Sequence, residues 1–317
     1  MDVLVHLVFI LMGFAALIAG ADFLVKGGAG IAKSLGVSPL AIGLTIVAYG
    51  TSMPEFMASF AAMWSGSSGI ALGNVFGSNI FNIAVVMGFA AALKTVKVEK
   101  EVFNIQLPIM LGVTLLVYVF MFQGSCISRV EGTILFLGII IYTVFSFYRS
   151  RKSNYRAEDG ISDIWSENRL LAVIALIVGA LFLFLGGQWV VKGSIFYADL
   201  LGIPDRIVGA TIVALGTSLP ELMTTVIGVI RKQVDLGVGN AIGSCIFNLL
   251  MVIGGTALYR PIESVWMDYR IEMGFVIISA IIIWPLTHRH RILQRWHGIV
   301  LLAIYIIFIS MLLTFKF

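Results

Sequence analysis

Two glutamates lie within long apolar segments of this chain, each at the end of nearly the same sequence. Gly-Thr-Ser-Met-Pro-Glu ends at Glu55 and Gly-Thr-Ser-Leu-Pro-Glu ends at Glu221, an offset of 166 residues. A carboxylate in the hydrocarbon core raises the free energy by roughly 2.5 to 3.5 kcal/mol, even on insertion scales. Because the chain accepts this penalty twice at matched positions, we expect the two carboxylates to act together in holding a cation.

The residues before each glutamate provide further oxygen ligands. Pro54 has no N–H, so the carbonyl of Gly50 loses its helical partner, and we expect free carbonyls from Ala48 to Gly50. Thr51 and Glu55 are four residues apart and share one helix face. Carboxylates, hydroxyls and carbonyls are the hard ligands that Na⁺ and Ca²⁺ prefer. The first copy also carries Ser52, and the second copy repeats the set with Thr217, Ser218, Pro220 and Glu221.

A second matched motif, Gly-Ser-x-Ile-Phe-Asn, lies on the next helix of each half and ends at Asn82 and Asn248. Ser78 and Asn82 are four residues apart, so both side chains can face the same neighbour; Ser244 repeats Ser78. We interpret their oxygens as completing an ion shell. The alternative is that these residues only pack helices together.

The prolines, glutamates and hydroxyls described above also have plain structural interpretations. The prolines could be ordinary kinks, the glutamates could be a structural pair or protonated acids, and the hydroxyls could bond to carbonyls of their own helix. However, the kinks are duplicated, and no Lys or Arg lies in the middle of a span to pair with either glutamate. For Asn74 and Asn240, which lie nearer the helix starts, we favour capping or packing.

Composition restricts the protein class. The chain has 317 residues, 59% hydrophobic and 12% charged, with a mean hydropathy of +1.01, which indicates a polytopic membrane protein. Its two cysteines cannot form a disulfide framework, and the sequence gives no sign of a cofactor. The start of the chain lacks the positive region of a cleaved signal peptide, so the first apolar run is expected to stay in the bilayer. The basic residues lie in short loops, which argues against nucleic-acid binding.

Apolar runs predict an all-α fold of ten transmembrane helices, with the second and seventh helices broken at the prolines. The predicted spans are 3–25, 38–64, 69–93, 103–122, 129–148, 170–192, 205–230, 235–258, 271–287 and 297–315. We divide the chain into a first five-helix repeat (1–148), a cytoplasmic linker (149–169) and a second repeat (170–317). Because five spans is an odd number, the second repeat is expected to be inverted, as in many secondary transporters.

Loop charges predict the orientation. With both termini outside, most of the 21 Lys and Arg residues fall in loops on the inside, as the positive-inside rule requires. The expected location is the inner (plasma) membrane of a prokaryotic cell. No obligatory protein partner is evident, so the lipid bilayer and the ions are the expected partners.

The paired Gly-Thr-Ser-x-Pro-Glu and Gly-Ser-x-Ile-Phe-Asn motifs resemble the repeats of the sodium/calcium exchanger family, in the cation/calcium antiporter superfamily. The resemblance covers the whole chain and suggests a compact microbial member without a large cytosolic insert. It implies that Glu55 and Glu221 bind both Ca²⁺ and Na⁺ and that the carbonyls of Ala48 and Ala214 face outer sodium positions. It further implies that hydroxyls or carbonyls of the Thr-Ser pairs bind ions and that the second motif lines the site.

The resemblance also implies three Na⁺ exchanged for one Ca²⁺, and a first and sixth helix that slide against a fixed core. Several relatives, including potassium-dependent ones, have Asp at the position of Asn248, so this residue argues against potassium coupling. Proton/calcium relatives often have a His after the glutamate, and this chain has none there.

We therefore predict a Na⁺/Ca²⁺ antiporter rather than an enzyme. Exchange of H⁺ for Ca²⁺ and potassium-dependent Na⁺/Ca²⁺ exchange remain the alternatives. A cation channel fits less well because channels usually form rings across subunits. An intramembrane hydrolase fits less well because the acids have no nucleophile–base arrangement beside them.

Overall fold

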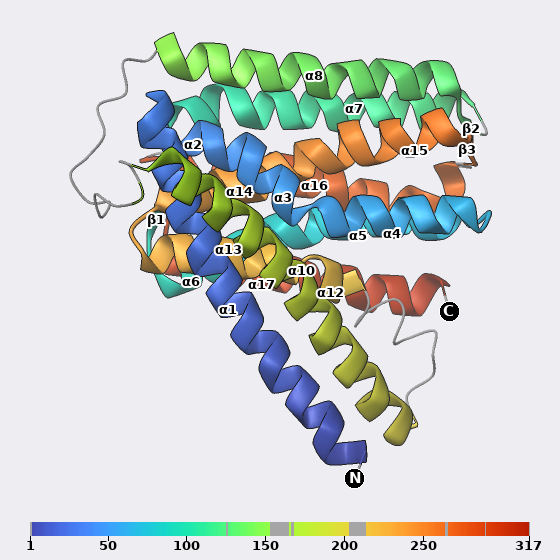
Figure 1. Cartoon of the computed structure of the whole chain (residues 1–317). Helices are drawn as coiled ribbons and strands as arrows, with labels where there is room; N and C mark the ends of the chain where they lie inside the picture. Colours follow the sequence, from blue (N-terminus) through green and yellow to red (C-terminus); the bar gives the residue numbers. More distant parts are fainter. Residues whose placement is uncertain are drawn as a thin grey trace.

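Long apolar helices make up nearly all of the protein (Figure 1). The computed structural model describes residues 2–124, 126–152, 165, 168–202, 214–263, 266–288 and 290–316.

The elements of the first half are α1 (Asp2–Leu35), α2 (Pro39–Ile42), the π-helical turn η1 (Gly43–Val47), α3 (Ala48–Thr51), α4 (Met53–Trp64), α5 (Ser68–Phe81), the π-helical turn η2 (Asn82–Val86), α6 (Met87–Leu93), β1 (Val96–Lys97), the π-helical turn η3 (Val102–Gln106), α7 (Leu107–Gln123), β2 (Cys126–Ile127) and α8 (Arg129–Lys152).

The elements of the second half are α10 (Arg169–Leu200), α12 (Ala214–Thr217), α13 (Leu219–Ile230), α14 (Val234–Phe247), the π-helical turn η5 (Asn248–Val252), α15 (Ile253–Tyr259), β3 (Ile262–Glu263), the 3₁₀ turn η6 (Trp266–Tyr269), α16 (Arg270–Thr287), β4 (Ile292–Leu293) and α17 (Arg295–Lys316).

Within the described residues, eight helices are long and apolar enough to cross a membrane. A ninth span is obtained if the pair Pro39–Thr51 and Met53–Trp64, bent by 43° at Ser52, is counted as one. The predicted break in the second helix is therefore confirmed. The tenth predicted span, 205–230, lies partly outside the described residues, and its described end contains the shorter apolar helix Leu219–Ile230.

Two predicted spans were too short. The first was predicted to end at residue 25 but α1 continues to Leu35, and the sixth was predicted to end at residue 192 but α10 continues to Leu200. Lys26, the first residue after the first predicted span, lies within α1. In the structure its Nζ lies 2.6 Å from Oδ2 of Asp22, one turn earlier on the same helix, so the charge is paired and the helix continues.

Helices α1 and α10 lie side by side and cross the other helices obliquely (Figure 1). Their contact is made through glycines. A Cβ added to Gly20 would lie 2.8 Å from the carbonyl oxygen of Gly179, and one added to Gly13 would lie 2.8 Å from that of Gly186. The absence of side chains at these positions lets the two backbones approach closely, as small residues do in membrane helix pairs.

Two short antiparallel strand pairs connect the halves at the ends of the molecule. In one pair Val96 of β1 is opposite Leu293 of β4, and in the other Ile127 of β2 is opposite Ile262 of β3. Shifting Val96 by 166 residues gives Ile262, and shifting Ile127 gives Leu293. The two pairings are therefore the same contact with the halves exchanged.

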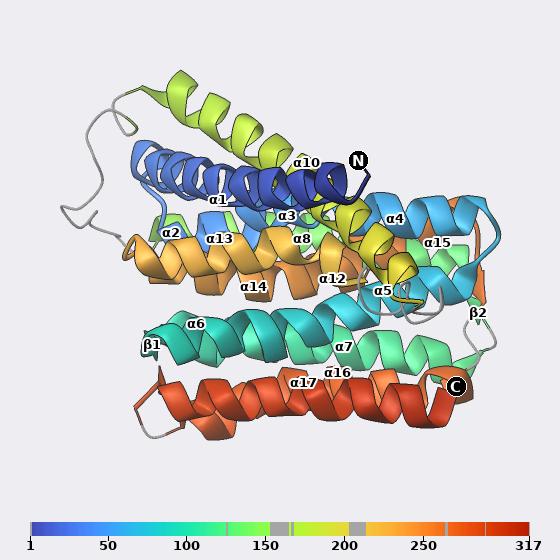
Figure 2. The same cartoon turned by 90° about the horizontal axis from the view of Figure 1, so that it is seen from below.

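Spans Ser68–Leu93 and Val234–Tyr259, which contain α5 and α14, are the most buried of the eight. Viewed from below, α1 lies on one side of the molecule and α17 on the opposite side, with α14 and α6 between them (Figure 2). The two central spans each contain a π-helical turn, and these turns begin at Asn82 and Asn248.

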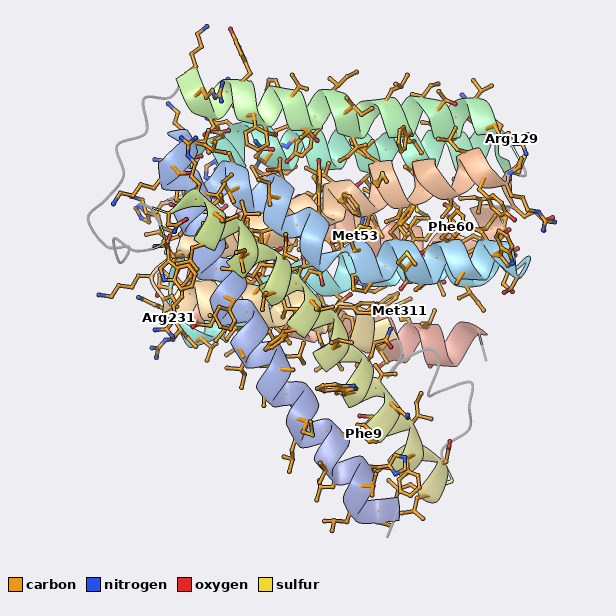
Figure 3. The ribbon with its side chains drawn as sticks, in the orientation of Figure 1. Phe9, Met53, Phe60, Arg129, Arg231 and Met311 are labelled. Carbon is orange, nitrogen blue, oxygen red and sulfur yellow. The ribbon has the colours of Figure 1, made fainter. Side chains whose placement is uncertain are left out.

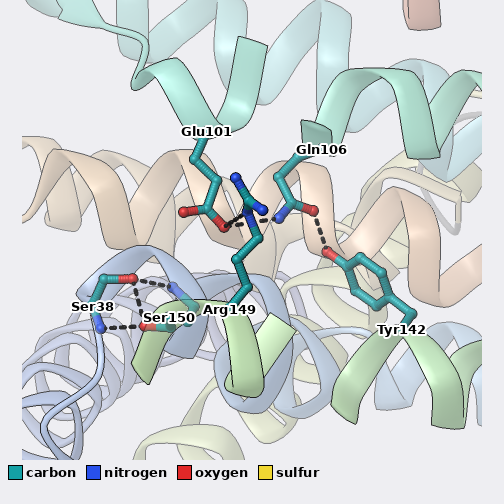
Figure 4. A network of polar contacts seen from close by, with 7 residues as sticks. Ser38, Glu101, Gln106, Tyr142, Arg149 and Ser150 are labelled. Atoms are coloured by element: carbon teal, nitrogen blue, oxygen red, sulfur yellow. Dashed lines mark hydrogen bonds and ion pairs between the residues drawn. The ribbon is translucent and has the colours of Figure 1, made fainter. Parts of the chain in front are cut away.

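A polar network ties the start of α2 to α8 and α7 (Figure 4). The amide of Ser38 donates to Oγ of Ser150 at 2.7 Å. Nearby, the hydroxyl of Tyr142 donates to Oε1 of Gln106 at 3.0 Å, and Nε2 of Gln106 lies 3.4 Å from Oε1 of Glu101. The bond between Ser38 and Ser150 fixes the start of the broken second helix to α8, and the bond between Tyr142 and Gln106 joins α8 to η3.

Candidate cation site

The two helix breaks bring both glutamates into the interior. Ser52 separates α3 from α4 with φ −90° and ψ 5°, and Ser218 separates α12 from α13 with φ −93° and ψ 2°. Each break is followed by Pro at the second position of the new helix, where its missing N–H does no harm. Glu55 and Glu221 therefore lie in the first turns of α4 and α13, and both are fully buried.

Each serine at a break bonds to the glutamate of the other half. Oγ of Ser52 donates to Oε1 of Glu221 at 2.7 Å, and Oγ of Ser218 donates to Oε1 of Glu55 at 2.9 Å. Residues more than 160 positions apart are thus joined twice, in a reciprocal arrangement. The sequence paired these residue types within each half, and the structure shows that the bonds cross between halves.

The second motif approaches the same carboxylates. Oγ of Ser78 lies 3.5 Å from Oε1 of Glu55 and 3.0 Å from Oγ of Ser218. Oγ of Ser244 lies 3.4 Å from Oε1 of Glu221. The predicted convergence of the two motifs is present in both halves.

Several buried oxygen atoms of this cluster have no hydrogen-bond partner within the described part of the chain. They are Oε2 of Glu55, Oε2 of Glu221 and the side-chain Oδ1 atoms of Asn82 and Asn248. Both asparagines are fully buried, and Nδ2 of Asn248 donates to Oδ1 of Asn79 at 3.3 Å. Buried polar atoms are normally satisfied, so these four oxygens fit a ligand that accepts electron pairs, such as a metal cation.

The threonines and alanines of the motif are arranged differently from our expectation. Oγ1 of Thr51 contacts Oδ1 of Asn240 at 3.0 Å and the carbonyl of Ala48 at 3.2 Å, and Oγ1 of Thr217 contacts Oδ1 of Asn74 at 3.4 Å. The carbonyl of Ala48, which we expected to be free, also accepts a hydrogen bond from the amide of Ser52 at 2.9 Å. It does so because the helix continues through α3 as far as the break.

The second copy of the motif differs from the first in the carbonyl that accepts this backbone hydrogen bond. The amide of Ser218 donates to the carbonyl of Leu215 at 3.1 Å, one residue later than the equivalent of Ala48. Ala214 is the first residue of α12. The residues before it, 203–213, lie outside the described part of the chain, so the predicted role of its carbonyl stays a prediction.

Asn74 and Asn240 have a more specific position than the capping or packing that the sequence favoured. Nδ2 of Asn74 donates to the backbone carbonyl of Glu55 at 3.1 Å and to Oγ of Ser59 at 2.9 Å. Nδ2 of Asn240 donates to the carbonyl of Glu221 at 3.3 Å and to Oγ1 of Thr225 at 3.3 Å. The signal was available in the sequence, because both asparagines recur at the same offset as the glutamates.

The charge of the cluster is uncompensated by protein cations. Among the buried residues that the structure describes there is no Lys or Arg, and the same residues contain no group of three or more His, Cys, Asp and Glu. The ligands available are thus two carboxylates together with hydroxyl and amide oxygens. This set suits a hard cation, such as Na⁺ or Ca²⁺, and not a metal that requires nitrogen or sulfur.

The chain resembles known proteins over its full length. The family model for the sodium/calcium exchanger protein matches residues 5–148 and 171–314. The putative antiporter CaxA of Alkalimonas amylolytica is 35% identical over 316 residues, covering 96% of this chain and 97% of that protein. The sodium/calcium exchanger MaX1 of Methanosarcina acetivorans is 33% identical, covering 97% of this chain and 98% of that protein.

A solved structure has the same fold. The sodium-calcium exchanger NCX_Mj, soaked with 10 mM Na⁺ and no Ca²⁺, superposes with a TM-score of 0.82 at 30% identity, covering 97% of this chain and 99% of that one. The match extends over both halves, including the motifs that form the cluster described above. This multi-pass membrane protein therefore belongs to the sodium/calcium exchanger family.

Proposed function

We propose that this protein is a secondary active antiporter that exchanges Na⁺ for Ca²⁺ by alternating access. The observation that carries the proposal is the reciprocal pair of Ser–Glu bonds around two buried carboxylates that lack a protein cation. The names of the relatives support the choice of ions.

In this proposal the fold consists of ten transmembrane helices in two inverted five-helix repeats, 1–148 and 170–317, joined by the linker 149–169. The support is that contacts recur when 166 is added to each residue number. This is true of the two strand pairs and of the bonds from Asn74 and Asn240. The matched family segments also end near residue 148 and resume at residue 171.

We assign the ion ligands to both halves. Glu55 and Glu221 would bind Ca²⁺ and Na⁺ directly, with the remaining oxygens supplied by Thr51, Ser52, Ser78, Asn82, Thr217, Ser218, Ser244 and Asn248. The carbonyls of Ala48 and Ala214 would reach sodium ions at the edge of the site. For Ala48 this requires a conformation in which its carbonyl no longer accepts both bonds described above.

The charge of the site explains coupling between the ions. Two carboxylates give a formal charge of −2, which one Ca²⁺ neutralises and which two or three Na⁺ approximately balance. Both sets of ions need the same oxygens, so binding of one set excludes the other. Moving the empty, doubly charged site through a low-dielectric interior is unfavourable, and this disfavours cycles in which only one ion is carried.

The proposed location is the plasma membrane of a prokaryotic cell, since the putative antiporter CaxA and the sodium/calcium exchanger MaX1, which are similar over nearly the whole chain, come from a bacterium and an archaeon. Loop charges favour both termini outside. In that orientation the N-terminal end of α1 and the C-terminal end of α10 face the exterior, and the linker faces the cytoplasm.

The driving ion can be determined by uptake of labelled calcium into proteoliposomes. Purified protein would be reconstituted in three batches, loaded with Na⁺, with K⁺, or at acid pH, and diluted into calcium solution free of the loaded ion. A fourth batch, loaded with Na⁺, would be diluted into calcium solution that contains K⁺. We expect uptake only from the sodium-loaded vesicles, and a sodium ionophore should abolish it. Uptake driven by protons, or by sodium only when potassium accompanies calcium outside the vesicles, would support the corresponding alternative antiporter instead.

A further inference from the structure

A charged contact joins α1 to the end of α13. Nε of Arg231 donates to Oδ1 of Asp22 at 2.7 Å, and Nη2 of Arg231 lies 2.7 Å from the same oxygen. The side chain of Asp22 is 22% exposed and that of Arg231 is 53% exposed. Lys26 also contacts Asp22, but both residues belong to α1, so only the arginine contact connects two helices.

The helices beside this contact are tightly packed. Ala21 and Val25 of α1 are buried in the smaller apolar cluster of the molecule, and Met223 and Ile227 of α13 pack against that cluster. Among the described residues, α1 is therefore closed onto α13 at this face. Figure 3 shows Arg231 at the end of the molecule opposite to Arg129.

The equivalent face of the other half is open. Adding 166 to Ala21 and Val25 gives Gly187 and Val191, and both of these residues line a cleft of about 590 Å³ between α4, α10 and the break before α13. Met57, the equivalent of Met223, also lines this cleft and is 57% exposed. At the closed face, α1 of the first half packs against the broken helix of the second half. At the open face, a cleft separates α10 of the second half from α4 of the first half.

The charged contact differs between the faces in the same way. The equivalents of Asp22 and Arg231 are Gln188 and Ser65, which are uncharged. Gln188 lies in the lining of the open cleft, and Ser65 is exposed at the end of α4. The equivalent positions at the open face therefore cannot form this ion pair.

We propose that the Asp22–Arg231 ion pair is a latch that favours closure of its own face and, with it, opening of the opposite cleft. The inference rests on the proposed alternating access, because opening the closed face would separate α1 from α13 and break the contact. Partly exposed ion pairs are weak, so the latch biases the two states by about two- to five-fold and does not lock either one.

The bias can be measured by labelling two reporter cysteines at equivalent positions. Ile227→Cys would report on the closed face and Ala61→Cys, a lining residue of the cleft, on the open face. The background would carry Cys126→Ser, since Cys126 is partly exposed whereas Cys245 is buried. Labelling rates with a polar maleimide would be measured on protein in lipid nanodiscs, in which both faces meet the solvent.

Removal of the latch should raise labelling of Ile227→Cys and lower labelling of Ala61→Cys, each by about two- to five-fold. Asp22→Asn and Arg231→Gln should have similar effects, and the double variant should add little because both changes remove one contact. Lys26→Gln is the matched control: it removes a charge of the same network but no contact between helices, so the labelling ratio should stay the same.

Transfer of the ion pair to the other face gives an independent test that does not disturb the native contact. The double variant Ser65→Arg with Gln188→Glu should lower labelling of Ala61→Cys and raise labelling of Ile227→Cys. Unchanged ratios in the latch variants and in the transferred pair would overturn the latch, even with normal sodium-driven uptake by the wild type. Absence of that uptake would refute the exchanger function separately, because labelling does not depend on it.

Discussion

Ser52 donates a hydrogen bond of 2.7 Å to the carboxylate of Glu221, a residue from the other half of the chain. The reverse contact, from Ser218 to Glu55, has nearly the same length at 2.9 Å. Each half of the protein therefore stabilises the acid of the other half. A cation bound to both glutamates would therefore contact groups that are hydrogen-bonded to the serines of both helix breaks.

The two glutamates should be equally necessary for transport. Glu55→Gln and Glu221→Gln keep the side-chain volume but remove one of the two charges, so the site can no longer neutralise Ca²⁺. We expect sodium-driven calcium uptake to fall to background in both variants, while the melting temperature is maintained because a buried charge has been removed. Glu99→Gln is the control, since Glu99 is exposed. Wild-type flux in either buried variant would refute the assignment.

Ser52 and Ser218, whose bonds cross between the halves, should each raise the affinity for calcium. Ser52→Ala and Ser218→Ala each remove a hydrogen bond to a charged acceptor, an interaction that typically contributes about 1.5 to 3 kcal/mol. We expect the half-saturating calcium concentration to rise by about ten-fold or more in each variant. It would be obtained from initial rates of uptake at a series of calcium concentrations. Ser34→Ala, on the partly exposed end of α1, serves as the control. An effect of one serine without the other would contradict the reciprocal arrangement.

Asn74 and Asn240, for which the sequence favoured capping or packing, should affect transport through their bonds to the backbone. Asn74→Ala and Asn240→Ala each release a glutamate carbonyl and a hydroxyl on the same helix. We expect weaker calcium binding by a few-fold to ten-fold together with a lower melting temperature, since buried polar groups lose their partner. Asn168→Ala, at the exposed start of α10, should lower stability slightly without changing calcium affinity. Unchanged affinity in both buried variants would assign these residues to packing alone.

The sequence predicted the parts of the site that depend on periodicity and repetition. Thr51 could be grouped with Glu55, and Ser78 with Asn82, because a four-residue spacing acts locally, and their second copies could be paired by the offset. The bonds that cross between halves could not be predicted, because a motif does not specify which neighbour its side chains meet. The bond from Asn74 to the carbonyl of Glu55 lies within one half, and its partner could not be read from the motif either, although the offset of 166 residues marked both asparagines.

The same reasoning applies to the fold. The hydrophobic runs predicted the position of most helices, but not that α1 and α10 extend to Leu35 and Leu200. The four π-helical turns found within the described residues have no sequence pattern that distinguishes them from the apolar helices around them. Each short strand, such as β1, has only two residues and is stabilised by a partner far along the chain. A segment of that length carries no local sequence signal for a strand.

The close contact of α1 and α10 should limit substitution at the glycines. A Cβ at Gly20 or Gly179 would lie less than 3 Å from the backbone of the facing helix, so Gly20→Ala and Gly179→Ala should destabilise the protein by about 1 to 3 kcal/mol. Gly112→Ala in α7 is the matched control, because a Cβ there meets no atom within 4 Å and alanine favours the helix. Thermal unfolding in detergent would measure both, and equal melting temperatures would contradict the close packing.

The claim that both carboxylates form one cation site is tested most directly by anomalous diffraction from crystals soaked in Sr²⁺ as a substitute for Ca²⁺. We predict a single strong peak within ligand distance of carboxylate oxygens of both Glu55 and Glu221, which weakens as Na⁺ is added to the soak. Separate peaks at the two glutamates, or a peak that contacts only one of them, would contradict a site shared between the halves.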